Sequence, residues 1–535
     1  MRSKNYTILL TEIITIILMV FNVLPVEASL FLTGLLIFYF IFSPIEDSLW
    51  VFIASIPLFV ALPITENFDS MANWRILLAI MFLVLVFRSG PSITSIKNFY
   101  NKWKLRENLK HFPMEYLAAV FLLIGFLSLF AANDVWVGVK KLLFLINIFL
   151  IFIIIRNLAS KNREVIKKII SAVGIALSLS LAIGYIQIIS VFFAPLYTFW
   201  QYWAKNIIPI FYGQGLSNLL SYSNTWFSYY DGQPPTLRMF SVFPDSHSFA
   251  LFSIIGLLFL LTAVILRQKG NKKLLIFRYL NLILLLLSLL FSGSRGIWAS
   301  ALALLILLLI FISFPRIIKI LFPNFFIRSK FSQIRDAKVF QLVFGSLIIF
   351  FLLFPISSWI LFQSQKAQLK DFTLDEGTLL IFKRAKSITD LSEVSAKTRL
   401  QIWERSLVSM GLHPFLGVGI GNYPVVLDED VKAAKRGASA HNLYLDVASE
   451  MGIFALLILL FIFSEIFKTA WRVFQREKES LIKYWAGFFA LVLIWILSYS
   501  LFDIVLLNDK VLLFFIISLG ILYAAAANLN QSTDL

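Results

Sequence analysis

The sequence predicts an all-α membrane protein, a polytopic bundle of about fourteen transmembrane helices with one large external loop. Its 535 residues are 59% hydrophobic and only 14% charged, whereas soluble domains are about half apolar and about a quarter charged. The apolar residues gather in stretches of about 17–25, the length that crosses a hydrocarbon core of about 30 Å. The chain has no cysteine, which excludes disulfides, thiolate metal sites and a cysteine nucleophile.

The loops between the predicted helices differ in charge. The helices lie near residues 7–24, 28–43, 48–64, 72–88, 114–131, 139–155, 169–194, 247–266, 277–292, 297–314, 340–362, 446–467, 484–501 and 510–527. With the N-terminus inside, the inner segments are 44–47, 89–113, 156–168, 267–276, 315–339 and 468–483. All but the first are basic, as the positive-inside rule requires of cytoplasmic loops. This parity places both termini in the cytoplasm. It also explains the net charge of +17 without nucleic acid as a partner.

Two long loops, 195–246 and 363–445, remain on the outer side. Loops of this length are exempt from the charge rule. The first holds twelve aromatic residues between Tyr197 and Tyr230, which suit an interfacial aromatic belt or, alternatively, a surface that stacks on sugar rings. We treat 1–535 as one membrane domain, with a motif-bearing core at 238–455 and an external subdomain at 363–445. Any chemistry is expected on the outer face.

A polar turn with the sequence SGSRGIW, residues 292–298, separates two predicted helices. An arginine at a membrane boundary usually has a partner or a ligand, because a charge near hydrocarbon is costly. Gly293 and Gly296 let the backbone approach a bound group, and a guanidinium fits phosphate oxygens bidentately. The turn predicts a phosphate or diphosphate clamp at Arg295, and an interfacial helix anchor is the alternative.

A second cationic segment, TRLQIWER at 398–405, lies in the second outer loop. Its apolar residues recur at helical spacing, which predicts a short amphipathic helix on the membrane face: Leu400, Trp403, Leu407 and Met410. Thr398 suits the N-cap of this helix and Gly411 its C-terminal end. Arg399 is a candidate anion ligand, whereas Arg405 is better explained as a solvated charge. The glycines of the following GVGIGN sequence do not belong to a βαβ unit, so they are not a dinucleotide site.

His441 and Gly452 are eleven residues apart at the start of a predicted helix, so they share one face if that helix is continuous. The helix dipole at His441 would disfavour the imidazolium, and a neutral imidazole is what a general base needs. A helix-capping histidine is the alternative. Arg238, ahead of the helix at 247–266, is a third candidate cation. His247 is a second candidate base, although a helix-start role is the preferred explanation.

In their order along the chain, these motifs resemble the O-antigen ligase and O-antigen polymerase superfamily of bacterial membrane glycosyltransferases. The shared elements are the Ser-Arg-Gly-x-Trp turn, the Arg-x3-Trp segment, the His-Pro-x2-Gly-x-Gly-x-Gly-Asn loop and the His-x10-Gly helix. The chain departs from the family at Asp245-Ser246-His247, where Pro-Asn is expected. It departs again at Trp403, where ligases usually carry leucine.

The resemblance implies transfer of a glycan from an undecaprenyl-diphosphate-linked donor to an acceptor hydroxyl at the outer face of the bacterial cytoplasmic membrane. It implies a metal-independent, inverting reaction without a cofactor, in surface polysaccharide, O-antigen or lipopolysaccharide biosynthesis. Arg295, Arg399 and, by a weaker match, Arg238 would bind the diphosphate. His441 would deprotonate the acceptor, and Gly293, Gly296 and Gly452 would support the site.

Three readings of the function remain open at this point. The first is a polysaccharide polymerase or ligase, and the second is a protein O-oligosaccharyltransferase of the same superfamily. The acceptor is accordingly a glycan, a lipid or a protein. The third reading is a transporter or flippase of the lipid-linked glycan. That reading predicts paired charges at the bilayer midplane and internal repeats, neither of which is evident in the sequence.

Overall fold

The structure, a computed structural model, describes residues 2–64, 71–89, 113–221, 225–230, 233–266, 272–313, 338–368, 394–429 and 438–531. Within these ranges the chain is almost entirely helical, with two short strands. Ten of the described helices are long and apolar enough to cross a membrane. The predicted all-α transmembrane bundle is therefore confirmed.

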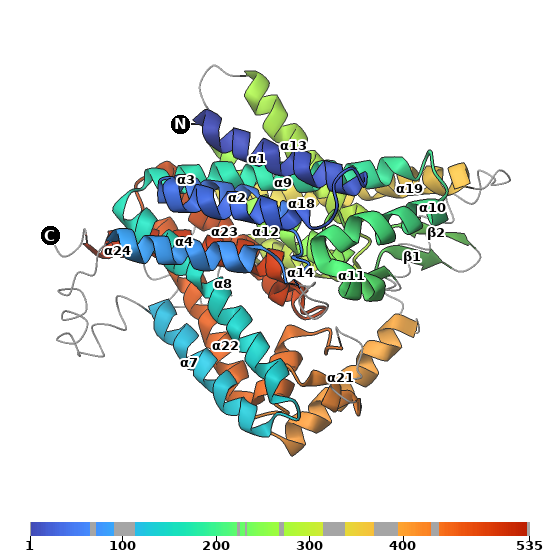
Figure 1. The fold of residues 1–535 in the computed structure, drawn as a ribbon. Helices are drawn as coiled ribbons and strands as arrows, with labels where there is room; N and C mark the ends of the chain where they lie inside the picture. The colour runs from blue at the N-terminus through green and yellow to red at the C-terminus, as the bar shows by residue number, and fades with distance from the viewer. Residues whose placement is uncertain are drawn as a thin grey trace.

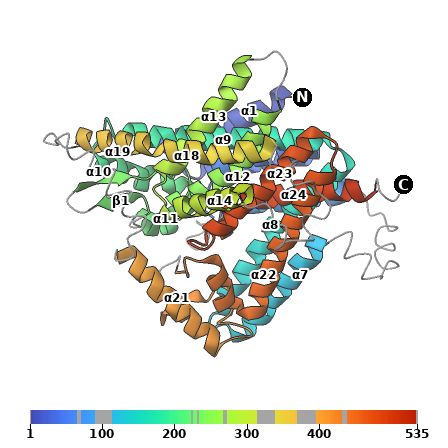
Figure 2. The ribbon, with the colours of Figure 1, turned by 180° about the vertical axis from the view of Figure 1, so that it is seen from behind.

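The helices follow the order of the predicted apolar stretches. The first half contains α1 (Arg2–Val20), α2 (Ala28–Phe42), α3 (Ile45–Ala54), α4 (Trp74–Ser89), α7 (Pro113–Ser128), α8 (Val135–Lys161) and α9 (Glu164–Ser190). The second half contains α12 (Ser246–Ile265), α13 (Lys272–Phe291), α14 (Arg295–Ser313), α18 (Lys338–Leu352), α19 (Phe354–Gln368), α21 (Val394–Leu412), α22 (Leu443–Arg476), α23 (Ser480–Tyr499) and α24 (Asp509–Gln531). In Figures 1 and 2 most of them form one body, from which α7, α21 and part of α22 project as a wedge.

Two predicted spans differ from the structure, and a proline accounts for each difference. The stretch 48–64 becomes the ten-residue α3, a 3-10 turn η1 (Ile56–Leu58) and an isolated bridge between Ala61 and Ala72. Pro57 cannot continue the helical hydrogen bonding, and ten residues are too few to cross the bilayer. The stretch 340–362 divides into α18 and α19 just before Pro355.

The first outer loop is folded. It contains α10 (Leu196–Tyr202), the π-helical turn η3 (Trp203–Ile207), α11 (Ile208–Ser221) and the antiparallel strands β1 (Phe227–Tyr230) and β2 (Gln233–Leu237). Trp203 and Trp226 are buried, and Trp226 stacks on Phe240 with ring centroids 4.6 Å apart. These two tryptophans pack the interior, so neither is available to stack on a sugar.

Three of the predicted inner segments meet in ion pairs at one end of the bundle. Lys168 contacts Glu46 and Asp47 at 2.9 and 3.3 Å. Arg163 contacts Glu477 and Glu479, each at 3.3 Å. The segments 44–47, 156–168 and 468–483 therefore share one side of the membrane, and Lys168 balances the acidic turn at 46–47. Most of 89–113 and 315–339, and residues 267–271, lie outside the described residues.

Candidate functional site

The polar turn between α13 and α14 packs against the end of β2. The Arg238 backbone N–H donates to the Trp226 carbonyl at 2.8 Å, and its Nε donates to Ser228 Oγ at 2.8 Å. Gly293 has φ +64°, and a Cβ there would lie 3.0 Å from Ser228 Oγ and 3.1 Å from Arg238 Cγ. Only glycine tolerates both this backbone conformation and this contact. The fold thus holds Arg238 directly against the turn that carries Arg295.

Arg295 is the first residue of α14, as the tight turn predicted. The helix dipole disfavours a cation at a helix N-terminus and favours an anion there. An anion bound between Arg295 and the start of α14 would therefore interact favourably with both. Gly296 follows, and a Cβ there would lie 2.8 Å from Phe502 Cβ and 3.0 Å from Tyr499 Cε2. The glycine lets the start of α14 approach the end of α23.

His247 lies in the first turn of α12, and its ring belongs to a hydrogen-bonded network. Asp245 caps the helix through the Ser248 N–H at 2.7 Å. His247 Nδ1 is 2.9 Å from Ser294 Oγ and 3.1 Å from Tyr499 Oη, and these two hydroxyls are 3.0 Å apart. The Asp503 carboxylate is 3.7 Å from the same nitrogen. The predicted helix-start position is confirmed, and the ring also contacts the residue before Arg295.

The cationic segment of the second outer loop forms α21, which is longer than predicted. The helix begins at Val394, so Thr398 lies inside it, and it continues through Gly411 to Leu412. The two predicted end residues were therefore wrong. Arg405 is exposed and contacts the Leu427 carbonyl at 3.0 Å and Asp428 at 3.4 Å, which fits a solvated charge. Arg399 is half-buried.

His441 immediately precedes the cap of α22. Asn442 is the N-cap, because its side chain accepts from the backbone N–H groups of Tyr444 and Leu445. His441 itself has φ +47°, an unusual left-handed conformation for a residue other than glycine. Its Nδ1 is buried and makes no hydrogen bond within the described part of the chain. The capping alternative is therefore wrong for His441, and one ring nitrogen is unpaired.

The helix that follows His441 is not continuous. Gly452 has φ +81°, and α22 kinks there. The loop after α21 fits into the kink: Ile453 N–H donates to the Pro414 carbonyl at 2.8 Å, and a Cβ on Gly452 would lie 2.1 Å from the Phe415 carbonyl oxygen. The predicted common face of His441 and Gly452 therefore does not form. Gly452 instead leaves space for the loop that follows α21.

The arginines and histidines of these motifs lie close enough to interact electrostatically, so they form one cluster. His247 lies within electrostatic range of Arg238, Arg295, Arg399 and His441. Burial, followed by the charge of Arg399, lowers the pKa of His441 to about 4, although Asp245 opposes this shift. The cluster therefore combines three guanidiniums with two imidazoles, and His441 is neutral at pH 7.

Two acidic residues also face the cluster. Burial raises the pKa of Asp503 to about 6, and the charge of Arg399 opposes the shift. Burial likewise raises the pKa of Asp245 to about 6, with an opposing hydrogen bond from Ser248. Asp503 and Tyr499, four residues before it, were not predicted from the sequence to belong to the site. An acid between two apolar stretches was the available signal.

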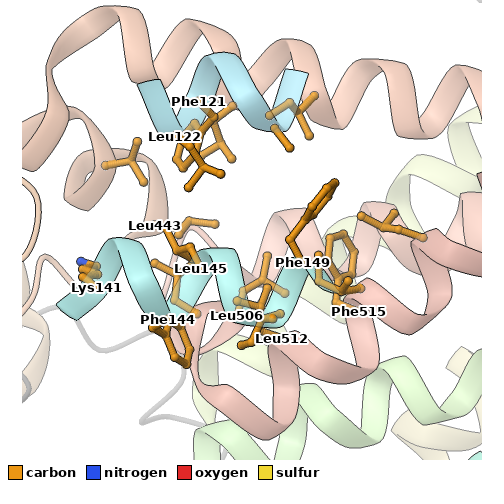
Figure 3. A pocket seen from close by; sticks show the side chains of 18 of the residues that line it. Phe121, Leu122, Lys141, Phe144, Leu145, Phe149, Leu443, Leu506, Leu512 and Phe515 are labelled. Atoms are coloured by element: carbon orange, nitrogen blue, oxygen red, sulfur yellow. The ribbon is translucent and has the colours of Figure 1, made fainter. Parts of the chain in front are cut away.

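The described residues also enclose an apolar cavity of about 180 Å³. It lies between α7, α8, α22 and α24 and reaches Leu443, two residues after His441. Figure 3 shows its aromatic and aliphatic walls, including Phe121, Phe149 and Phe515, with Lys141 at one end. Lys141 Nζ is 2.5 Å from the Glu450 carboxylate. The lining suits a hydrocarbon chain.

Part of this region is similar to a known protein family. Residues 280–460, about a third of the chain, match the family model described as O-antigen ligase. The matched region contains Arg295, Arg399, His441 and Gly452, whereas Arg238 and His247 precede it. No curated protein matches the chain. The match agrees with the resemblance that the motifs indicated: over residues 280–460 this multi-pass membrane protein is similar to the O-antigen ligase family.

Proposed function

We propose that this protein transfers a glycan from a polyprenyl-diphosphate-linked donor, undecaprenyl diphosphate in bacteria, to an acceptor hydroxyl. The observation that carries the proposal is the cluster of Arg238, Arg295 and Arg399 around neutral histidines. Guanidiniums placed in advance stabilise the charge that develops as a diphosphate leaves. The apolar cavity suits part of the donor's isoprenoid chain.

The chemistry then needs one base. The acceptor oxygen attacks the anomeric carbon from the face opposite the diphosphate, and its proton passes to His441. The bond between the anomeric carbon and the diphosphate oxygen breaks, so polyprenyl diphosphate leaves with the bonding electrons and the anomeric centre inverts. We expect no divalent ion to be needed, because the arginines neutralise the leaving group. A glycan, lipid or protein hydroxyl serves equally well in this scheme.

His441 is proposed as the base because its Nδ1 is buried and unpaired among the described residues. His247 also lies in the cluster, but its Nδ1 is already engaged by Ser294 and Tyr499. Its proposed role is to hold the turn that carries Arg295. Burial and, after it, the uncompensated charge of Arg399 lower the pKa of His441 to about 4. A bound diphosphate would offset that charge and make the imidazole a stronger base.

The outer-face assignment rests on the direction of α23. Glu479, just before this helix, pairs with Arg163 in a predicted inner segment, and Tyr499 at its other end contacts His247. The cluster and the predicted inner segments therefore lie at opposite ends of one transmembrane helix. The positive-inside rule makes the cluster's end the outer one.

The test uses purified full-length protein in lipid nanodiscs with a synthetic polyprenyl-diphosphate-linked glycan and a mixture of candidate acceptors. We expect release of polyprenyl diphosphate together with a new glycosidic product. Arg295→Lys and Arg399→Lys should lose most activity, because lysine keeps the charge but not the planar fork. Arg405→Lys is the matched control on the same helix as Arg399 and should behave as wild type. Movement of intact donor across vesicles without release of diphosphate would instead establish a transporter.

A further inference from the structure

Both backbone polar groups of Ala440 are bound by side chains from different parts of the chain. Its carbonyl accepts a hydrogen bond from the Trp403 indole Nε1 at 2.9 Å. Its N–H donates to Asp446 Oδ1 at 3.0 Å. Ala440 is fully buried, so water cannot replace either partner. The peptide immediately before His441 is therefore held from two sides.

These two hydrogen bonds explain how His441 keeps its unusual backbone conformation. A left-handed residue other than glycine costs about 1–2 kcal/mol, so its surroundings must impose it. On the C-terminal side, Asn442 anchors the start of α22. On the N-terminal side, Trp403 and Asp446 bind the backbone of Ala440 at 2.9 and 3.0 Å, and Ser439 Oγ accepts from the His441 N–H at 3.4 Å. The direction of the His441 ring therefore depends on the partners of Ala440.

Trp403 also lies one helical turn from Arg399. Residues four apart share a face of a helix, and His441 lies within electrostatic range of Arg399. One turn further along α21, Ser406 Oγ is 2.7 Å from Tyr423 Oη. The indole hydrogen bond thus joins the helix that carries Arg399 to the segment that carries His441.

We infer that Trp403 is a positioning residue, which sets His441 relative to Arg399 through its indole N–H. The inference rests on the proposed function, because it presumes that Arg399 binds the donor and that His441 receives the proton. Donor and acceptor must meet at about 3–3.5 Å, and a displacement of about 1 Å costs on the order of 100-fold in rate.

The test compares Trp403→Phe with wild type in the nanodisc assay. Phenylalanine keeps an aromatic ring and removes only the donor. We expect kcat to fall about 10-fold with the KM for the donor changed less than about 2-fold, as the loss of one buried hydrogen bond suggests. Trp485→Phe is the control, because the Trp485 side chain is fully buried but its indole N–H has no partner in the described chain, whereas the half-buried Trp403 donates a hydrogen bond. It should retain the wild-type kcat.

A double-mutant cycle separates positioning from a merely structural role. If Trp403 acts through His441, adding Trp403→Phe to His441→Ala leaves the single-turnover rate of His441→Ala unchanged. A further 10-fold loss in that background would overturn the inference, as would a wild-type kcat for Trp403→Phe alone. Full activity of His441→Ala would instead refute the proposed base. The two failures are therefore distinguishable.

Discussion

His441→Ala should lower the rate of glycan transfer by about 10²–10⁴, the usual contribution of a general base. The remaining rate comes from the arginines, which the substitution does not touch. His247→Ala should cost much less. It removes hydrogen bonds to Ser294 and Tyr499, but those two hydroxyls stay within 3.0 Å of each other. The loss of one or two such bonds corresponds to a rate about 3–30-fold lower.

The pH dependence provides a second measure of the same base. The neutral imidazole accepts the proton, so activity falls only when His441 becomes protonated. Its lowered pKa of about 4 places the acidic limb of kcat/KM near pH 4, well below the ordinary histidine value of 6.5. Folding stability attributable to His441 follows the same direction. The unfolded chain binds the proton first, so stability is lost as the pH falls from about 6.5 to about 4.

The assay is steady-state release of polyprenyl diphosphate by full-length protein in nanodiscs between pH 4 and pH 8. The folded fraction is followed in parallel by size-exclusion chromatography, because stability also falls at low pH. The limb should be absent from the residual activity of His441→Ala. If the limb persisted in His441→Ala, His441 would not be the group that titrates, and if His247→Ala were the more damaging variant, the base would be His247.

Three further predictions follow from the geometry. Gly452→Ala should destabilise the protein by at least about 2 kcal/mol, because alanine disfavours the left-handed backbone there and its Cβ would lie 2.1 Å from the Phe415 oxygen. An unchanged melting temperature would contradict the described kink. Lys141→Met should lower the free energy of unfolding by roughly 3 kcal/mol, because it leaves the buried Glu450 charge unpaired. The melting temperature should recover in the double variant Lys141→Met/Glu450→Met. If it does not recover, loss of the ion pair is not the cause. Glycan transfer should continue in excess EDTA, and inhibition reversed by added magnesium would refute the metal-independent scheme.

Several features of the site were predictable from local sequence. The turn at 292–298 is short and polar between apolar runs, so it had to end one helix and begin another. That placed Arg295 at a helix start, where the structure has it. Asp245 and Asn442 are good N-cap residues, and both cap helices. Charge placed loops 156–168 and 468–483 on one side, and the alternation of the helices placed the acidic segment 44–47 with them.

Other features depend on contacts between distant segments. Periodicity predicted a continuous helix after His441, because nothing in the local sequence reveals that the loop at 414–422 inserts at Gly452. The ends of α21 were also wrong, since Thr398 and Gly411 are tolerated inside a helix whose packing determines its length. Cap preferences are worth only about 1 kcal/mol, so tertiary packing overrides them.

The sequence by itself determined the class of the protein: a multi-pass helical membrane protein whose arginine and histidine motifs resemble O-antigen ligases. Long apolar stretches have few alternatives in a bilayer, because every backbone polar group must be satisfied within the chain. Only the tertiary structure decided which side chains meet. It placed His247 beside the turn of Arg295, added Tyr499 and Asp503 to the cluster, and joined Trp403 to the peptide before His441. Those contacts join residues far apart in sequence, and local periodicity carries no information about such pairings.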